Sequence, residues 1–379
     1  MMLLNNDKQT IWEQYHAGHP SRVPVMLGMN NRVYLLDPRF NTNGHTYQDI
    51  FNDPAQMLAT QLHWQELTRT HYHRFCDYPT GLPDKWQVSA HFQNVYEAWF
   101  FGCPLRFKGG QIPDTSPILT NDNKRAVFDV NIEHPLERDP CKRGIEFTER
   151  MMELARGYEY QGRPIEVLPY LPIGSDGPFT VALNLRGIDW LTDLVLDPDY
   201  ADELMAFITR AAINRAQAVL KYWGKELQEV ALADDSVEMI SAAMYAERVL
   251  PHHQNFYNAL DPENKLLHKM HLCGDDARHF PTIVRACHVR SIDTGFPVDF
   301  AWLRKHLGTE VEILGGVEVG LMMNGTPAQI YERAREILTS GVLEGKRFVL
   351  REANNLPPAT PEQNLAALYQ AALDWGRYE

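Results

Sequence analysis

The chain has 379 residues, of which 44% are hydrophobic, so it can bury a large core; its length suits either one α/β barrel with insertions or two ordinary domains. The formal net charge of -13 argues against nucleic acid and anionic membranes as partners, because both attract clustered Lys and Arg. We find no apolar run long enough to span a bilayer and no N-terminal signal pattern. We therefore expect a soluble, cytoplasmic protein.

Cysteine usage agrees with a reducing compartment. The cysteines are odd in number and scattered along the chain, which is not the pattern of a disulfide framework. They are Cys76, Cys103, Cys141, Cys273 and Cys287. We also find no repeat of fixed period and no low-complexity tract.

The N-terminal part predicts a short helix, a strand and a longer helix. Residues 8–16 have the pattern of an amphipathic helix, and the apolar run 23–28 ends in glycine, as a buried strand often does. Asn30 and Asn31 follow that strand. Asp53 before Pro54 predicts the start of a helix that runs to about residue 72.

Residues 75–135 are harder to interpret, because they are rich in Trp, Phe, Gly and Pro. Short alternating runs such as 86–90 lead us to interpret the stretch as a hairpin and loop excursion that covers a pocket. Its aromatic side chains either pack against one another, which is the commoner case, or contact the substrate.

From residue 145 onward, strand-like and helical segments alternate. The strand-like runs are 165–170, 228–233, 266–272, 289–293, 311–315 and 347–351. Two of the helices begin with predicted capping boxes, at Thr326 and Thr360, each followed by proline.

This alternation predicts an α/β fold with a mostly parallel sheet that closes into a (β/α)8 TIM barrel. We expect a single barrel domain over residues 1–379, with an N-terminal helical extension and residues 75–135 as a lid-like excursion near the barrel mouth. A doubly wound open sheet is the alternative. No G-x-G-x-x-G motif follows any strand, which weakens that alternative.

In such a barrel the chemistry lies at the C-terminal ends of the strands. Polar residues gather at these predicted ends. They are Asn30, Asn31, Asp176, Asp234, Asp235, Ser236, His271, Cys273, Asp293, Thr294, Glu318, Glu352, Asn354 and Asn355. The plainer explanation is that loops are polar in any case and that aspartates cap the following helices.

His271 and Cys273 are the sharpest pair, because positions i and i+2 of a strand face the same side. Imidazole and thiolate are ligands that Zn2+ takes readily, and a catalytic site needs only about three of them. Taken alone, such a pair is more often a buried cysteine beside a hydrogen-bonded histidine than a metal site. Cys287 lies roughly 18 Å further along the next predicted helix, so we exclude it as a third ligand.

Four motifs in the second half of the chain resemble the uroporphyrinogen decarboxylase superfamily, including its branch of zinc-dependent, corrinoid-linked methyltransferases. The motifs are HLCG at 271–274, IDTG at 292–295, LGGV at 314–317 followed by GTP at 325–327, and LPPATPEQNL at 356–365. The resemblance covers about residues 225–375 well and the N-terminal half loosely. It implies a (β/α)8 barrel.

The chain departs from both branches of that superfamily. The paired arginines of the decarboxylases are absent after Val25. The methyltransferases hold zinc with a His-x-Cys pair, matched here by His271 and Cys273, and with a later cysteine, in whose place Asn354 stands. Glu352, two residues earlier on the same strand face, becomes our expected third ligand, since carboxylate also binds zinc.

The resemblance implies a zinc-dependent transfer of a methyl group between a small molecule and a corrinoid carried by a partner protein. A carboxylate in place of the second sulfur makes the metal harder and favours an oxygen donor such as an aryl methyl ether. We assign catalytic roles to Asp235, Asp293 and Glu318, which would orient the substrate or the imidazole. Cofactor-binding roles are assigned to Asn30, Asn31 and Asp176.

Other functions stay open. A methylcorrinoid:thiol methyltransferase would use the same metal but would transfer the methyl group from the corrinoid to a thiol. A metal-free decarboxylase is disfavoured by the net charge and the missing arginines. In a non-catalytic binding protein His271 and Cys273 would be core residues only. The sequence leaves open the methyl donor and whether the chain forms a homodimer.

Overall fold

The computed structural model describes residues 5–79 and 81–378. The strands are β1 Trp86–Ser89, β2 Leu105–Arg106, β3 Asp114–Thr115, β4 Glu159–Tyr160, β5 Arg163–Leu168, β6 Glu229–Ala233, β7 Leu267–Leu272, β8 Ser291–Thr294, β9 Glu312–Glu318 and β10 Phe348–Ala353. The helices are α1 Asn5–His16, α2 Arg32–Leu35, α3 Tyr47–Asn52, α4 Pro54–Thr70, α5 Tyr96–Phe100, α6 Cys141–Ala155, α7 Pro178–Arg186, α8 Asp189–Leu196, α9 Pro198–Trp223, α10 Ala242–Met244, α11 Leu250–Leu260, α12 Phe280–Ala286, α13 Phe300–Leu307, α14 Val319–Asn324, α15 Pro327–Thr339 and α16 Glu362–Trp375.

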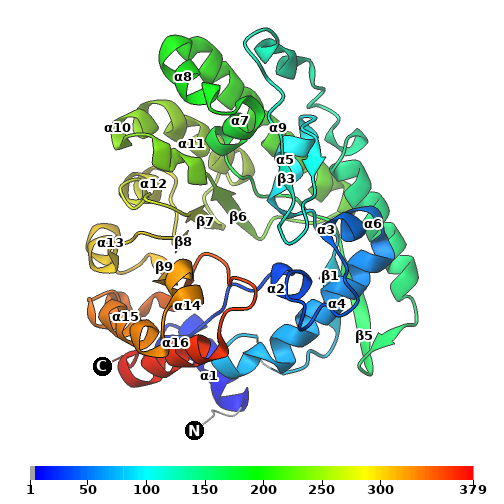
Figure 1. The fold of residues 1–379 in the computed structure, drawn as a ribbon. Helices are drawn as coiled ribbons and strands as arrows, with labels where there is room; N and C mark the ends of the chain where they lie inside the picture. The colour runs from blue at the N-terminus through cyan, green and yellow to red at the C-terminus, as the bar shows by residue number, and fades with distance from the viewer. Residues whose placement is uncertain (1–4, 80, 379) are drawn as a thin grey trace.

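A parallel sheet in the order β10-β9-β8-β7-β6 forms the centre of the fold, with helices outside it (Figure 1). Single parallel bridges extend this sheet on both sides. Val25 pairs with Leu350 and Met26 with Tyr78 on one side, while Ser175 pairs with Leu232 on the other. Eight parallel segments thus follow one another in chain order, as in a (β/α)8 barrel.

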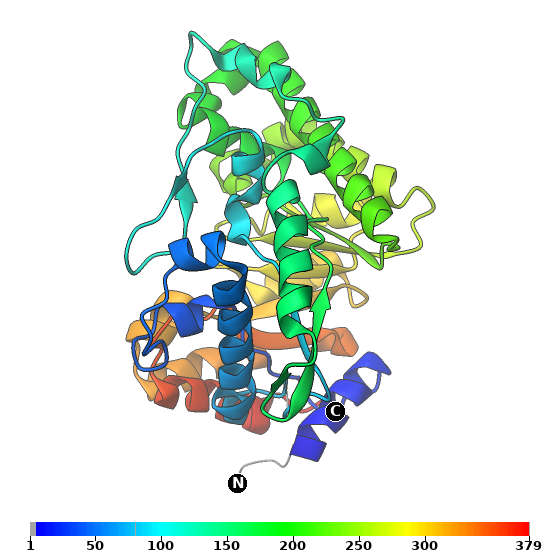
Figure 2. The same cartoon turned by 90° about the vertical axis from the view of Figure 1, so that its right-hand side faces the viewer.

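The barrel is not closed by hydrogen bonds. Among the described residues, no bridge joins the segment at Tyr78 to the one at Ser175. The order β1-β5-β4 forms a second, smaller sheet, and α4 and α6 run side by side in Figure 2. The α/β class and the parallel topology are as predicted, whereas the closed ring is not seen.

The excursion at 75–135 differs from our interpretation in one respect. Strand β1 pairs in parallel with β5, so residues 86–89 belong to a sheet and not to a hairpin. The hairpin is formed by β2 and β3, which pair antiparallel. The aromatic side chains pack on one another, as in the edge-to-face contact of Phe92 and Trp99 at 5.5 Å, and so they serve the core.

Two of the three predicted helix starts are confirmed. Asp53 accepts a hydrogen bond from the Ala55 N–H, and Thr326 forms the full capping box with Gln329. The box at Thr360 is wrong. The Thr360 hydroxyl donates to the Pro357 carbonyl instead, and α16 begins without a side-chain cap.

Helix α1 covers the N-terminal ends of the central strands. The Tyr15 hydroxyl donates to Glu312 Oε1 at 2.8 Å, and the Ser291 hydroxyl donates to Glu312 Oε2 at 2.5 Å. Ser291 and Glu312 are the first residues of β8 and β9, so the opposite, C-terminal ends are left for a site. No helix in the described part of the chain is long and apolar enough to cross a bilayer.

Gly28 lies where the first segment meets β10. Its N–H donates to Glu352 Oε1 at 2.7 Å, and its carbonyl accepts from the Leu356 N–H at 3.0 Å. A Cβ at this position would lie 2.6 Å from the Asn354 carbonyl oxygen and would also overlap the ends of the Arg351 and Glu352 side chains. Only glycine therefore fits without moving the backbone at Asn354 as well as these two buried side chains.

We therefore expect Gly28→Ala to lower the free energy of unfolding by about 1–3 kcal/mol, since overpacking displaces neighbours that cannot move cheaply. Gly109→Ala is the matched control, because a Cβ at Gly109 meets no atom within 4 Å. Urea unfolding of both variants and the parent measures the difference. Equal losses in the two variants would contradict the packing argument.

Glu352 predicts a pH dependence of stability. The side chain is fully buried, and burial raises its pKa to about 7, against the opposing effect of Arg351. Since the unfolded chain releases this proton near pH 4.5, the folded state binds the extra proton between pH 4.5 and 7. Stability should fall by up to about 3 kcal/mol as pH rises through that window.

The variant Glu352→Gln should flatten this part of the pH profile, as measured by urea unfolding from pH 4.5 to 8. Identical slopes in parent and variant would assign the pH dependence to other groups.

Candidate metal and substrate site

The register of the central strands brings three ligand types together at their C-terminal ends. Ala233 of β6 pairs with His271 of β7, and His271 pairs with Asp293 of β8. Asp235 and Cys273 lie two residues beyond Ala233 and His271, so they follow on the same side. One ligand atom each of Asp235, His271 and Cys273 lies within 4.8 Å of the other two.

The imidazole of His271 lies between two carboxylates. Its Nε2 is 3.6 Å from Asp235 Oδ1, and its Nδ1 is 3.3 Å from Asp293 Oδ2. The Cys273 backbone N–H donates to Asp235 Oδ1 at 2.8 Å. His271 and Cys273 thus face one way, as their spacing predicts, and Asp235 is positioned beside both.

Burial and the neighbouring carboxylates set the charges of these groups. Burial disfavours protonation of His271, but Asp293 and Asp235 outweigh it, so the pKa of His271 is raised. The pKa of Asp293 is lowered, because Arg351 and His271 together outweigh its burial. Burial and then Asp235 raise the pKa of the Cys273 thiol well above its ordinary value. Without a cation the thiol therefore keeps its proton.

Arg351 supports Asp293 from the neighbouring part of the sheet. Asp293 is in register with Leu314 of β9, and Leu314 with Val349 of β10, two residues before Arg351. Arg351 therefore faces the same side and donates from Nη1 to Asp293 Oδ2 at 2.9 Å. We did not predict a role for Arg351 from the sequence. Its charge within the apolar run 348–351 was the signal that could have revealed it.

Glu352, our expected third ligand, is not brought into this group. Successive strand residues face opposite sides, so Glu352 does not project toward His271 as Arg351 does, although its Oε1 comes within 3.6 Å of Arg351 Nη2. Its Oε1 accepts from the Gly28 N–H, and its Oε2 is buried without a partner. Asp235 stands beside the His-Cys pair instead.

The remaining predicted residues are engaged in local contacts. Glu318 Oε1 accepts from Arg333 at 2.9 Å. Asn31 is buried and its Oδ1 accepts from Gln93 at 2.8 Å, while Asn30 donates to Asn355 at 3.3 Å. The five cysteines are free thiols, and only Cys273 belongs to the metal-ligand group found among the described residues.

A cavity of about 630 Å3 opens beside Asp235. Asp176 and Ser236 line it, and residues 111–115 of the excursion form another wall. The Asp176 N–H donates to Glu97, which is itself paired with the buried Arg215 at 2.8 Å. Burial and then Glu97 raise the pKa of Asp176 well above its ordinary value. Burial and Glu97 thus favour the protonated form of Asp176, the form that can donate a proton into this cavity.

The donor set fits zinc. Nitrogen, sulfur and oxygen are the atoms that Zn2+ binds in proteins, and three such ligands leave a fourth position for a substrate. The hydrogen bond between His271 Nδ1 and Asp293 is the usual support of a metal-binding histidine, because it fixes the ring and leaves Nε2 for the metal.

Comparisons with known proteins agree with the predicted resemblance. The uroporphyrinogen decarboxylase (URO-D) family model matches residues 90–375. The chain is 31% identical over 292 residues to a methylated-thiol–coenzyme M methyltransferase of Methanosarcina mazei, which covers 74% of this chain and 70% of the relative. It is 23% identical over 296 residues to a methylcobamide:CoM methyltransferase of the same organism, covering 76% and 79%.

Among solved structures, a methyltransferase from Methanosarcina mazei superposes with a TM-score of 0.64 at 18% identity, covering 97% of this chain and 98% of that one. At this identity the match concerns the fold alone. The predicted family is confirmed by the extent of the family match and by the first relative. The chain belongs to the uroporphyrinogen decarboxylase superfamily, and the two relatives named above are methyltransferases.

Proposed function

We propose that this protein is a zinc-dependent methyltransferase that moves a methyl group between a small molecule and a corrinoid protein. The observation that carries the proposal is the convergence of Asp235, His271 and Cys273 within 4.8 Å at the C-terminal ends of the strands. The names of the relatives, which specify methylated thiols and methylcobamide as substrates of those proteins, support methyl transfer as the reaction class.

The three ligands would hold zinc, whose chemistry is to polarise the substrate heteroatom that carries or receives the methyl group. Asp293 accepts a hydrogen bond from His271 Nδ1–H and keeps the ring oriented. The guanidinium of Arg351, which donates to Asp293, favours the ionised form of this carboxyl. The substrate would lie in the cavity that Asp176 and Asp235 line.

The first candidate donor is a methyl ether, in the first place an aryl methyl ether. A ligand set with one sulfur and one carboxylate is harder than a set with two sulfurs, and harder metals prefer oxygen. When the methyl group leaves as a cation equivalent to the reduced corrinoid, the ether oxygen keeps the bonding pair and needs a proton. Asp176, whose pKa burial raises, can donate it from the wall of the same cavity.

The second candidate is methylation of a thiol by a methylated corrinoid protein. It is favoured by the names of the relatives, which specify a methylated thiol and coenzyme M for one protein and methylcobamide and CoM for the other. The two candidates use the same residues and differ in the group that meets the metal.

Zinc content tests the ligand set. We expect about one zinc per chain in the untagged protein and almost none in the double variant His271→Ala, Cys273→Ser. Asp235→Asn should bind zinc at least about 10-fold more weakly, whereas Glu352→Gln should keep it. Mass spectrometry of elements after dialysis gives the stoichiometry.

Equal zinc in the double variant and the parent would mean that the metal lies elsewhere. Loss of zinc from Glu352→Gln, with retention in Asp235→Asn, would restore Glu352 as the third ligand.

Methyl transfer tests the direction. Zinc-loaded protein is mixed either with cob(I)alamin and methoxylated arenes or with methylcob(III)alamin and thiols, and the corrinoid absorbance is followed. We expect methylation of cob(I)alamin by methoxylated arenes to be the faster of the two reactions. Its rate should fall about 100-fold or more in His271→Ala. Faster demethylation of methylcob(III)alamin by thiols would favour the second candidate. Equal rates in His271→Ala and the parent would exclude the proposed metal chemistry.

A further inference from the structure

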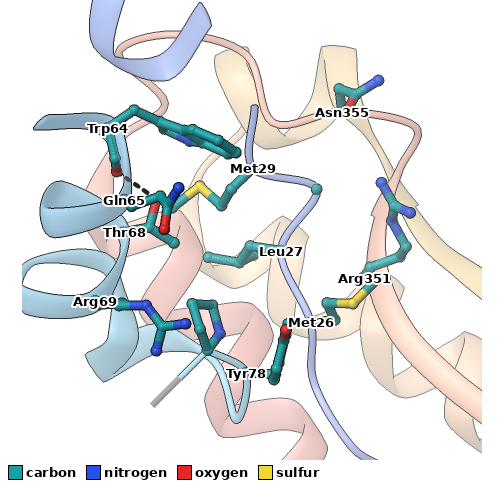
Figure 3. A pocket seen from close by; sticks show the side chains of 12 residues that line it. Met26, Leu27, Met29, Trp64, Gln65, Thr68, Arg69, Tyr78, Arg351 and Asn355 are labelled. Atoms are coloured by element: carbon teal, nitrogen blue, oxygen red, sulfur yellow. Dashed lines mark hydrogen bonds between the residues drawn. The ribbon is translucent and has the colours of Figure 1, made fainter. Parts of the chain in front are cut away.

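A second cavity, of about 410 Å3, is lined by Arg351. It is enclosed by the segment at residues 26–29, by α4 and by the C-terminal end of β10, as Figure 3 shows. Its apolar wall includes Met26, Met29, Trp64 and Tyr78, and its charged groups are Arg69 and Arg351. Thioethers and aromatic rings form an adaptable surface for a flat apolar group.

The two cavities differ in charge. Two guanidinium groups and no carboxylate line the second cavity among the described residues. The cavity beside the metal ligands is lined by three aspartates, Asp114, Asp176 and Asp235, and by a single arginine, Arg32. In a chain with a net charge of -13, this separation means that the second cavity favours an anion.

The guanidinium of Arg351 lies at the wall of this cavity, and its side chain is 7% exposed. Its Nη1 donates to Asp293 at 2.9 Å, and its other nitrogens donate to the backbone carbonyls of Glu352 and Asn354. Asp293 also pairs with His271, and Glu352 is the other carboxyl nearby, 3.6 Å away. An anion in the cavity would therefore be stabilised by a buried guanidinium.

Trp64 supplies a flat apolar surface at the wall of this cavity. Trp64 lies at the wall of the cavity close to Met29, as Figure 3 shows.

We propose that this cavity is a binding site for a small organic anion with a flat apolar body, such as an arene carboxylate. The apolar body would lie against Trp64 and the methionines, and the anionic group would face the arginines. Arg351 contacts Asp293 at 2.9 Å, and Asp293 contacts His271 at 3.3 Å, so occupancy of the cavity is coupled to the metal centre. The coupling rests on the proposed function, whereas the binding itself does not.

Calorimetric titration of the full chain with benzoate, benzamide and benzylamine tests the binding. The three probes share a ring and differ in charge. We expect benzoate to bind at least about 10-fold more tightly than benzamide, which corresponds to one charge-assisted hydrogen bond, and benzylamine not to bind detectably. Benzylamine binding as tightly as benzoate, or no benzoate binding at millimolar concentration, would overturn the proposal.

Two pairs of variants locate the site. Arg69→Met should weaken benzoate binding about 10-fold, and its matched control Arg32→Met, in the other cavity, should not. Asn355→Asp is isosteric and adds a negative charge to the second cavity, so it should also weaken binding, whereas Asn184→Asp in the other cavity should not. Unchanged benzoate affinity in both Arg69→Met and Asn355→Asp would overturn the location.

Zinc affinity with and without saturating benzoate tests the coupling. Because linkage is reciprocal, zinc should change the benzoate affinity by the same factor as benzoate changes the zinc affinity. Benzoate binding with an unchanged zinc affinity would overturn the coupling and keep the site. A chain that binds no zinc at all would refute the proposed function, while the benzoate titrations would still decide the anion site.

Discussion

The parallel register of the central strands is the constraint on which the candidate site depends. Ala233, His271 and Asp293 stand at one level of neighbouring strands, and this level fixes the positions of Asp235 and Cys273 just above it. A slip of one residue would turn every one of these side chains to the other face. The ligand group is therefore specified by the pairing of strands that are far apart in the sequence, and no single loop determines it.

The sequence predicted those parts of the structure that depend on local patterns. Alternation of apolar runs and helices located the later strands to within a few residues, and the i, i+2 spacing placed His271 and Cys273 on one side. Residues such as Asp235 and Asp293 could be assigned to the same end, because strand ends converge in a barrel.

Features that depend on long-range geometry could not be predicted. Which of the successive residues of β10 faces His271 is decided by the register with β9, and the choice of Glu352 as third ligand therefore could not be checked from the sequence. The same holds for β1, whose partner β5 lies about 75 residues later in the chain. The misplaced cap at Thr360 has a local cause, since its hydroxyl bonds back to Pro357.

Arg351 connects the second cavity to the candidate metal ligands. It lines the apolar, basic cavity and donates to Asp293, which in turn contacts His271. A buried charge of this kind is costly unless it is paired, and its partner is shared with the imidazole that would bind the metal. The proposed metal site and the proposed anion site would therefore influence each other through Arg351 and Asp293.

The position of α1 has a practical consequence. Its Tyr15 is anchored at the first residues of the central strands, at the end remote from Asp235, His271 and Cys273. A tether or fusion partner attached to the exposed side of this helix would leave the opposite rim, formed by the C-terminal ends of the central strands, unobstructed. Immobilisation on an electrode through α1 would then present that rim to a large incoming protein.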